Sequence, residues 1–394
     1  MMNNIWSDNK YMNLAINILL FLVGINFLHY GQLILPIICF LLFIDNKLHF
    51  KVNSPFIFVV LCLFAVSFYA FSYQLGFYSV MGFTCPMAYY IGSNIKHPSE
   101  ENIRKVIYLF AISMGLHVVL NAIIELILHG VNGFFFSSSH YDFWTRQKIS
   151  NTGTAINGDY LIGIMYYVLL KEKNKNLKYF TIVLFLLSMF YLVVIGRRTS
   201  LIMLAITFIV LFLFESRIIK KMSGKAKAYL IRSFIIAALS VILIIVFYHF
   251  NIFSCQKFLN QFRIIVKFRQ GLIGDERFKL YFGALKLLTS YPFGGQQISG
   301  ILGLPIHEFW LDIYDYAGVV PFVLMIIYSL SYVKNIVRLY RDNKISIETK
   351  VFLFGIYICT IIQMFLEPIM TGASLFLIIS IIVNTIVERC LLDE

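Results

Sequence analysis

The feature of this sequence that most limits its fold is a series of apolar runs of about the length that crosses a lipid bilayer. The hydrocarbon core of a bilayer is about 30 Å thick, and a helix needs roughly 20 apolar residues to cross it. Backbone groups at that depth are satisfied only in helices or closed barrels. We therefore predict an all-α polytopic membrane protein with about 12 transmembrane helices. The runs fall near residues 13–28, 31–44, 55–72, 76–93, 105–128, 153–170, 178–195, 199–214, 231–250, 308–333, 351–366 and 370–387.

The composition indicates that lipid is the main solvent of the chain. Of the 394 residues, 59% are hydrophobic and only 13% are charged, and the mean hydropathy is +0.80. A soluble fold of this size needs more polar surface than this chain supplies. The polar stretch Met1 to Tyr11 does not resemble a cleavable signal, so we expect an uncleaved first span. We expect residues 1–394 to form a single integral membrane domain.

The cysteines and histidines do not follow a metal-binding pattern. No two of the six cysteines are spaced C-x-x-C, and the eight histidines are scattered along the chain. Structural zinc sites need such ligands at characteristic spacings. We therefore predict no bound metal, no cofactor and no disulfide framework.

The distribution of lysine and arginine between alternate loops predicts the orientation. Cytoplasmic loops carry the excess of basic residues. If the N-terminus is inside, 22 of the 33 basic residues fall in cytoplasmic segments. We therefore predict that both ends of the chain are cytoplasmic.

The 11 basic residues that remain on the outer side are clustered in a few loops. Arg146 and Lys148 share one loop, Arg197 and Arg198 form a turn, and seven lie between residues 251 and 306. Positive charge placed against the orientation rule favours an anionic ligand. The alternative is that these side chains extend toward lipid headgroups, as long basic side chains do near helix ends.

The longest outward loop covers residues 251–306, between the ninth and tenth spans. Apolar and basic residues alternate there at helical spacing, which predicts short amphipathic helices on the membrane surface. Arg263 and Arg269 lie in the first part of the loop and are candidate contacts for an anionic substrate. A second helix is expected from Glu276 to Ser290, with Arg277 in its first turn.

Two further groups of polar residues are expected at the outer ends of spans. The guanidinium groups of adjacent arginines at 197 and 198 match the geometry of a diphosphate. The alternative to diphosphate binding is that these two side chains extend from the turn to the lipid headgroups. Glu308, Asp312 and Asp315 follow His307 at i, i+4 and i+7 of the expected helix. Acidic residues entering a membrane are costly unless they meet cations or water. Their alternative role is to neutralise the nearby arginines.

The order of these motifs resembles the O-antigen polymerase and O-antigen ligase superfamily, which are membrane glycosyltransferases. The resemblance covers roughly residues 180–330. Arg198 matches the arginine of the family's Ser-Arg-Thr-like turn, Arg277 matches its loop-helix arginine, and His307 matches its histidine. The turn Pro292-Phe293-Gly294-Gly295 and the spacing of Leu311 and Gly318 after the histidine also match. Two positions depart from the pattern: Glu308 stands where Asn is usual, and Pro321 stands where a second glycine is common.

The resemblance implies a GT-C-like fold in the bacterial inner membrane, with the active site facing the periplasm. The implied substrates are undecaprenyl-diphosphate-linked glycans, and a chain-length regulator and a flippase of the same pathway are implied partners, with membrane lipid but no nucleic acid. Arg198 and Arg277 would hold the diphosphate, and His307 would act as the base. Arg197, Glu308 and Asp312 are further candidate contacts for the diphosphate or the acceptor.

Three functional alternatives follow from the sequence besides a polymerase. An O-antigen ligase would transfer the glycan to lipid A core with the same three residues, and we favour the polymerase because Glu308 departs from the histidine-asparagine pair typical of ligases. A lipid-linked oligosaccharide flippase would place charged residues near the bilayer midplane and contain two related halves. A purely structural scaffold would leave the external arginines without a purpose.

Overall fold

The computed structural model describes a mainly helical chain with one two-stranded hairpin. It covers residues 4–72, 76–136, 140–149, 151–218, 276–306, 308–367 and 369–393. The first half contains α1 (Lys10–Gly24), the 3₁₀ turns η1 (Phe27–His29) and η2 (Gly31–Ile34), α2 (Leu35–Asp45), α3 (Pro55–Ser72), α4 (Phe77–Val80), η4 (Met81–Phe83), α5 (Thr84–Ser93), α6 (Glu100–Phe136), β1 (His140–Tyr141), β2 (Lys148–Ile149), α7 (Asn151–Leu170), α8 (Lys175–Val194) and α9 (Arg198–Ile218).

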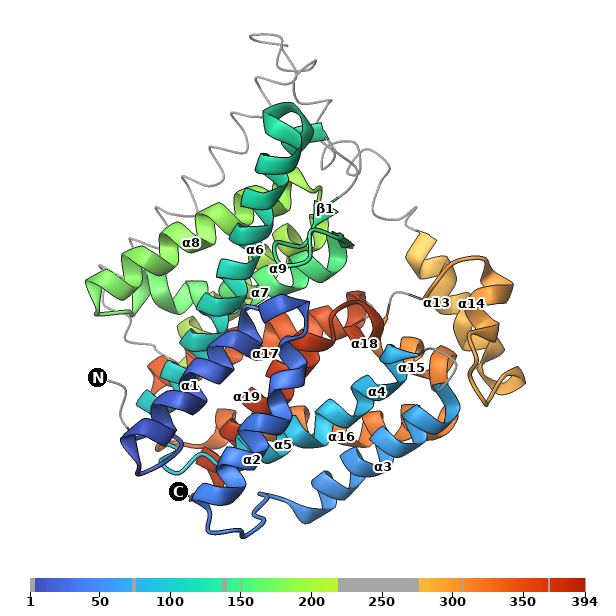
Figure 1. The fold of residues 1–394 in the computed structure, drawn as a ribbon. Coiled ribbons are helices and arrows are strands. Elements are labelled where there is room, and N and C mark those ends of the chain that lie inside the picture. The colour runs from blue at the N-terminus through green and yellow to red at the C-terminus, as the bar shows by residue number, and fades with distance from the viewer. Residues whose placement is uncertain are drawn as a thin grey trace.

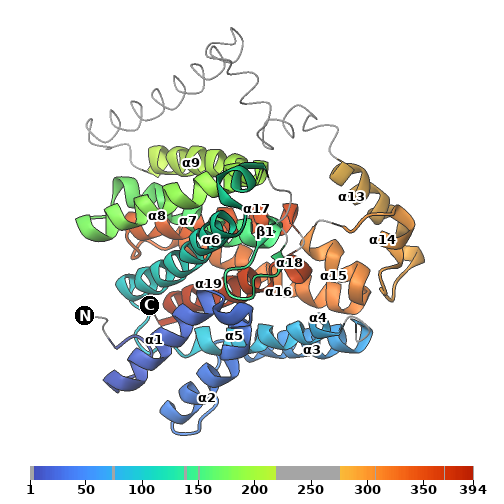
Figure 2. The same cartoon turned by 45° about the horizontal axis from the view of Figure 1, so that its top comes forward.

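The second half combines short helices with three long ones, α16, α17 and α19. It contains α13 (Glu276–Leu287), η6 (Leu288–Ser290), α14 (Gln297–Leu302), α15 (Phe309–Ala317), α16 (Val319–Arg341), α17 (Ile347–Leu366), α18 (Ile369–Gly372) and α19 (Ser374–Asp393). In both views α13 and α14 lie on one side of the molecule, and α1 and the C-terminal end of α19 lie toward the other (Figure 1, Figure 2).

Seven of the described helices are long and apolar enough to cross a membrane, namely α3, α6, α8, α9, α16, α17 and α19. This agrees with the predicted all-α polytopic class, and six of the seven coincide with predicted spans. The first two predicted spans are the shorter apolar helices α1 and α2. The predicted span at 231–250 lies outside the described residues.

Several predicted spans are not continuous helices, among them those at 76–93 and 308–333. The run at 76–93 is divided into α4, η4 and α5, and Pro86 lies in the first turn of α5, where a missing N–H is tolerated. The run at 308–333 breaks at Gly318, which has φ of +83° between α15 and α16. The span there is Val319–Arg341, eleven residues later at its start than predicted. The correction places Asp312 in a separate short helix, with Glu308 as its N-cap.

Helix α7 lies at the centre of its half of the fold. It packs against α6, α8, α9 and α17, and nearly every side chain from Thr154 to Val168 is buried. A helix enclosed by protein does not need an apolar surface for lipid, so polar residues are tolerated wherever a neighbour supplies a partner. This explains why α7 is not among the seven helices that are long and apolar enough to cross a membrane, although it has 20 residues.

Glycines allow α7 and α17 to approach closely. A Cβ atom added at Gly355 of α17 would overlap the carbonyl oxygen of Gly163 in α7, and one added at Gly163 would lie 2.9 Å from Cδ1 of Ile356. Small residues at such crossings let helix backbones approach in a membrane, where the hydrophobic effect does not drive association.

One end of the bundle is held together by polar side chains, and we call it the Arg104 end. Arg104 of α6 donates to Thr349 Oγ1 of α17 at 2.6 Å, and the hydroxyl of Tyr108 donates to Glu172 at 2.7 Å. Lys171 lies 2.6 Å from Glu215 at the end of α9. The predicted topology assigns this end to the cytoplasm.

We predict that Gly355→Ala destabilises the protein, because the added methyl group overlaps the backbone of Gly163. Overpacking of this kind costs about 1–3 kcal/mol. The measurement is the apparent melting temperature of the purified chain in detergent. Gly300→Ala is the matched control, since a Cβ there meets no atom within 4 Å. Equal melting temperatures for the two variants would contradict the close α7–α17 packing.

Candidate functional site

The turn between α8 and α9 carries the two adjacent arginines. Gly196 has φ of +76°, a conformation that glycine adopts without a Cβ penalty. The N–H of Gly196 donates to the carbonyl of Val193 at 3.0 Å, and the N–H of Arg197 donates to Leu192 at 2.9 Å. These bonds close α8, and α9 then begins at Arg198. We call this end of the bundle the Arg197 end.

Arg197 forms a buried ion pair with Glu367, the residue that follows α17. Arg197 is 6% exposed and Glu367 is fully buried. The hydroxyl of Thr199 donates to the same carboxylate oxygen, Oε1, at 3.2 Å. A charge in a buried position needs a partner of opposite sign, and removing either one is strongly destabilising. The pair therefore fixes the α8–α9 turn against the end of α17.

This pairing separates the roles of the two arginines. The guanidinium of Arg197 is engaged by Glu367, whereas Arg198 is half-buried at the first position of α9. Arg197 was predicted to contact the diphosphate or the acceptor, which stays a prediction, and its ion pair with Glu367 makes it a residue that orients the turn. Arg198 is the more accessible of the two to a ligand.

A second buried polar contact lies one helical turn away on α17. Gln363 donates its side-chain amide to the carboxylate of Asp159 in α7, and both residues are buried. Gln363 and Glu367 are four residues apart, which places them near one another on the same face of the helix. The polar face at this end of α17 therefore contacts both α7 and the α8–α9 turn.

The same end of α17 also contacts α15 and α13. Phe365, two residues before Glu367, packs edge-to-face on Trp310 of α15 with ring centroids 4.9 Å apart. The hydroxyl of Tyr281 in α13 donates to the carbonyl of Phe365 at 3.4 Å. Three segments that are distant in sequence thus meet at the last turn of α17: the α8–α9 turn, α13 and α15.

The Pro292–Gly295 turn packs directly on the break between α15 and α16. The N–H of Val319 donates to the carbonyl of Pro292 at 2.8 Å, and the N–H of Gly295 donates to Tyr316 at 3.1 Å. A Cβ at Gly294 would lie 2.6 Å from the N of Gly318. Gly294 and Gly318 are therefore both required for this close backbone contact, which holds α15 against the Pro292–Gly295 turn.

The acidic residues near the start of α15 bind backbone groups. The side chain of Glu308 caps α15 by accepting from the N–H of Leu311 at 2.6 Å. Asp315 accepts from the N–H groups of Ile298 and Ser299, at 3.0 and 3.1 Å, and so holds the start of α14. Asp312 is buried in the same helix. These contacts give Glu308 and Asp315 a structural task.

Four further predicted site residues lie wholly or partly outside the described part of the chain. His307, Arg263 and Arg269 lie outside the described residues. Arg277 lies in the first turn of α13, and its side chain is likewise outside the description. Since α15 starts at Phe309, His307 lies two residues before a helix that contacts the end of α17.

One buried cluster was not predicted from the sequence. Asp142, in the hairpin between β1 and β2, has its Oδ2 atom 3.1 Å from Nε2 of His117 in α6 and 3.3 Å from Nδ1 of His29. Nδ1 of His117 lies 3.2 Å from the side-chain amide nitrogen of Asn157 in α7. A lone histidine within an apolar span was the available signal, because such a residue needs a polar partner.

The hydrogen bonds of this cluster determine the ionisation of Asp142. Burial raises the pKa of its carboxyl, but hydrogen bonds from His117, His29 and the backbone N–H of Thr145 outweigh burial and hold the pKa below its ordinary value. A lowered pKa contributes stability above the unfolded-state pKa of about 3.9, and this stability is lost as the pH falls. The cluster therefore favours the folded state at neutral pH.

We predict that Arg197→Met and Glu367→Leu each destabilise the protein by about 3–5 kcal/mol, because each leaves a buried charge without its main partner. The double variant should lose much less than the sum of the two single losses. The measurement is the free energy of unfolding in a detergent–SDS titration. Lys148→Gln, at an exposed position, is the control. Strictly additive losses would contradict a coupled ion pair.

Comparison with known proteins adds no homologue to this description. No protein-family model matches the chain, and no curated protein matches its sequence.

Proposed function

We propose that the protein is an O-antigen polymerase, or a polymerase of a related surface polysaccharide. It transfers a growing glycan from undecaprenyl diphosphate to an incoming lipid-linked repeat unit on the periplasmic side of the inner membrane. The observation that carries the proposal is the convergence at the last turn of α17. The Arg197–Arg198 turn, the helix that starts with Glu276-Arg277 and the helix that follows His307 all contact this turn.

The chemistry of glycosyl transfer explains why cations are needed at this position. The bond between the sugar C1 and the diphosphate oxygen breaks, and the leaving diphosphate gains negative charge. Guanidinium groups that are already in place stabilise this charge without reorganisation during the reaction. Arg198 and Arg277 are the proposed diphosphate ligands. The Arg197–Glu367 pair supports the proposal because it holds the turn that carries Arg198 in place.

The acceptor must lose a proton as its hydroxyl oxygen attacks C1. An imidazole accepts a proton near neutral pH, and His307 is the proposed base. The capped start of α15, where Glu308 accepts from the N–H of Leu311, fixes the chain directly after His307. This local order is what a positioned base requires.

A lipid-linked oligosaccharide flippase is the second candidate, and one observation favours it. The His29–Asp142–His117 cluster extends from a partly exposed imidazole to a buried one beside Asn157 of α7. Chains of ionisable groups inside a membrane bundle are typical of proton-coupled transporters. The two candidates differ in whether glycosidic bonds are formed.

A deletion strain examined by lipopolysaccharide gel separates the candidates. Loss of a polymerase leaves lipid A core carrying a single repeat unit, and this is the pattern we predict. Loss of a ligase leaves bare core while lipid-linked polymer accumulates, and loss of a flippase leaves bare core without polymer. Either of the last two patterns would refute the polymerase assignment.

We further predict that Arg198→Lys and Arg277→Lys lose most polymerisation at normal expression. An ammonium group does not reproduce the bidentate contact of a guanidinium with phosphate. The measurement is restoration of long glycan chains in the deletion strain. Arg146→Lys, at an exposed position in the hairpin, is the matched control and should restore them fully. Wild-type chain growth with both lysine variants would show that these arginines do not grip the diphosphate.

A further inference from the structure

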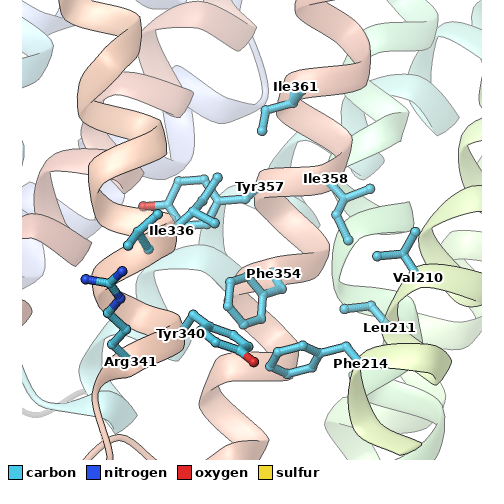
Figure 3. Close-up of a pocket in the computed structure, with 11 residues that line it drawn as sticks. Val210, Leu211, Phe214, Ile336, Tyr340, Arg341, Phe354, Tyr357, Ile358 and Ile361 are labelled. Atoms are coloured by element: carbon cyan, nitrogen blue, oxygen red, sulfur yellow. The ribbon is translucent and has the colours of Figure 1, made fainter. Parts of the chain in front are cut away.

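A groove opens on the side of the bundle between α9, α16 and α17 (Figure 3). Its volume is about 580 Å³, within the range of small-molecule sites. Val210 and Phe214 of α9, Ile336 of α16, and Phe354 and Ile358 of α17 are among the apolar side chains that line it. The groove is distinct from the Arg197 end, where the proposed site lies.

The groove is open on its outer side within the described residues. Helices α9 and α16 both pack on α17, which forms the floor between them. Val210 and Val337, on opposite walls, are 40% and 41% exposed, and Tyr340 is 59% exposed. Within the part of the chain that the structure describes, these side chains are not covered. If α9 and α16 cross the membrane, the exposed parts of these three side chains therefore face the hydrocarbon core.

One end of the groove is basic. Arg341, an exposed lining residue, is the last residue of α16, and Arg338 lies one turn before it. No described carboxylate lies within 4.0 Å of Arg341. The neighbouring Asp342 uses its side chain to accept from the backbone N–H of Lys344 at 2.8 Å. This basic end belongs to the Arg104 end of the bundle, since Lys350, next to Thr349, donates to the carbonyl of Tyr340.

We propose that this groove binds an anionic phospholipid, with an acyl chain against the apolar side chains and its phosphate at Arg341. The distance from Phe354 to Ile361 along α17 is about 10 Å. The groove is therefore long enough only for the part of one acyl chain that lies nearest the headgroup. Basic pockets between transmembrane helices on the cytoplasmic side recognise anionic headgroups. A zwitterionic lipid carries its own ammonium group and gains less from the arginine. The proposal is independent of the glycosyltransferase activity.

The first test is native mass spectrometry of the purified full chain with equal amounts of phosphatidylglycerol and phosphatidylethanolamine. The wild type should retain phosphatidylglycerol preferentially, and Arg341→Gln should reduce this preference about fivefold, the effect of one basic residue near a membrane surface. Lys10→Gln removes an exposed charge away from the groove and should leave the preference unchanged. Equal retention of both lipids by the wild type would overturn the proposal.

The second test identifies the occupant directly. A photoreactive benzoylphenylalanine placed at Val337 should form adducts with phosphatidylglycerol in membranes, and the additional change Val210→Trp, which fills the groove, should reduce the adducts. Val59→Trp, on the exposed side of α3, should not reduce them. Adducts with another segment of this chain instead of lipid would show that the groove is an internal packing surface, and the proposal would be wrong.

Discussion

The rest of the structure depends on the close packing of α7 against α17. Gly163 and Gly355 let the two backbones meet, and α7 is then enclosed by α6, α8, α9 and α17. Because α7 is surrounded by protein, its polar residues must find partners on the neighbouring helices. Asn157 faces His117 of α6, and Asp159 faces Gln363 of α17. Side chains two residues apart on a helix point in nearly opposite directions. Asn157 and Asp159 therefore belong to two separate polar clusters on opposite sides of α7.

The α17 side of this arrangement leads to the candidate site. Gln363 contacts α7, and one turn later Glu367 holds Arg197 and Thr199. Between them Phe365 contacts α13 and α15. Helix packing thereby sets the positions of Arg197 and Thr199, the two residues that flank Arg198. Rigid helices give a more precise arrangement than a loop alone, and the proposed stabilisation of a leaving diphosphate would require such precision.

Hydrophobic periodicity and length predicted the helical class and most of the long apolar helices, because lipid exposure leaves a strong signal in composition. The break at Gly318 was not predicted, since glycines are tolerated within spans and only the contact with Pro292 requires this one. The Arg197–Glu367 pair joins residues 170 positions apart, so no local pattern reveals it. The acids after His307 were predicted as a shared face, but Glu308 and Asp315 each bind backbone N–H groups, which helical spacing does not specify.

The most direct test of the account is turnover by the purified full chain in proteoliposomes supplied with undecaprenyl-diphosphate-linked repeat units. The account predicts glycans of several repeats that remain lipid-linked, together with released undecaprenyl diphosphate. It also predicts that His307→Ala slows this reaction by roughly 100- to 10,000-fold, the usual contribution of a general base. Repeat units that cross the bilayer without elongation, or an undiminished rate with His307→Ala, would contradict it.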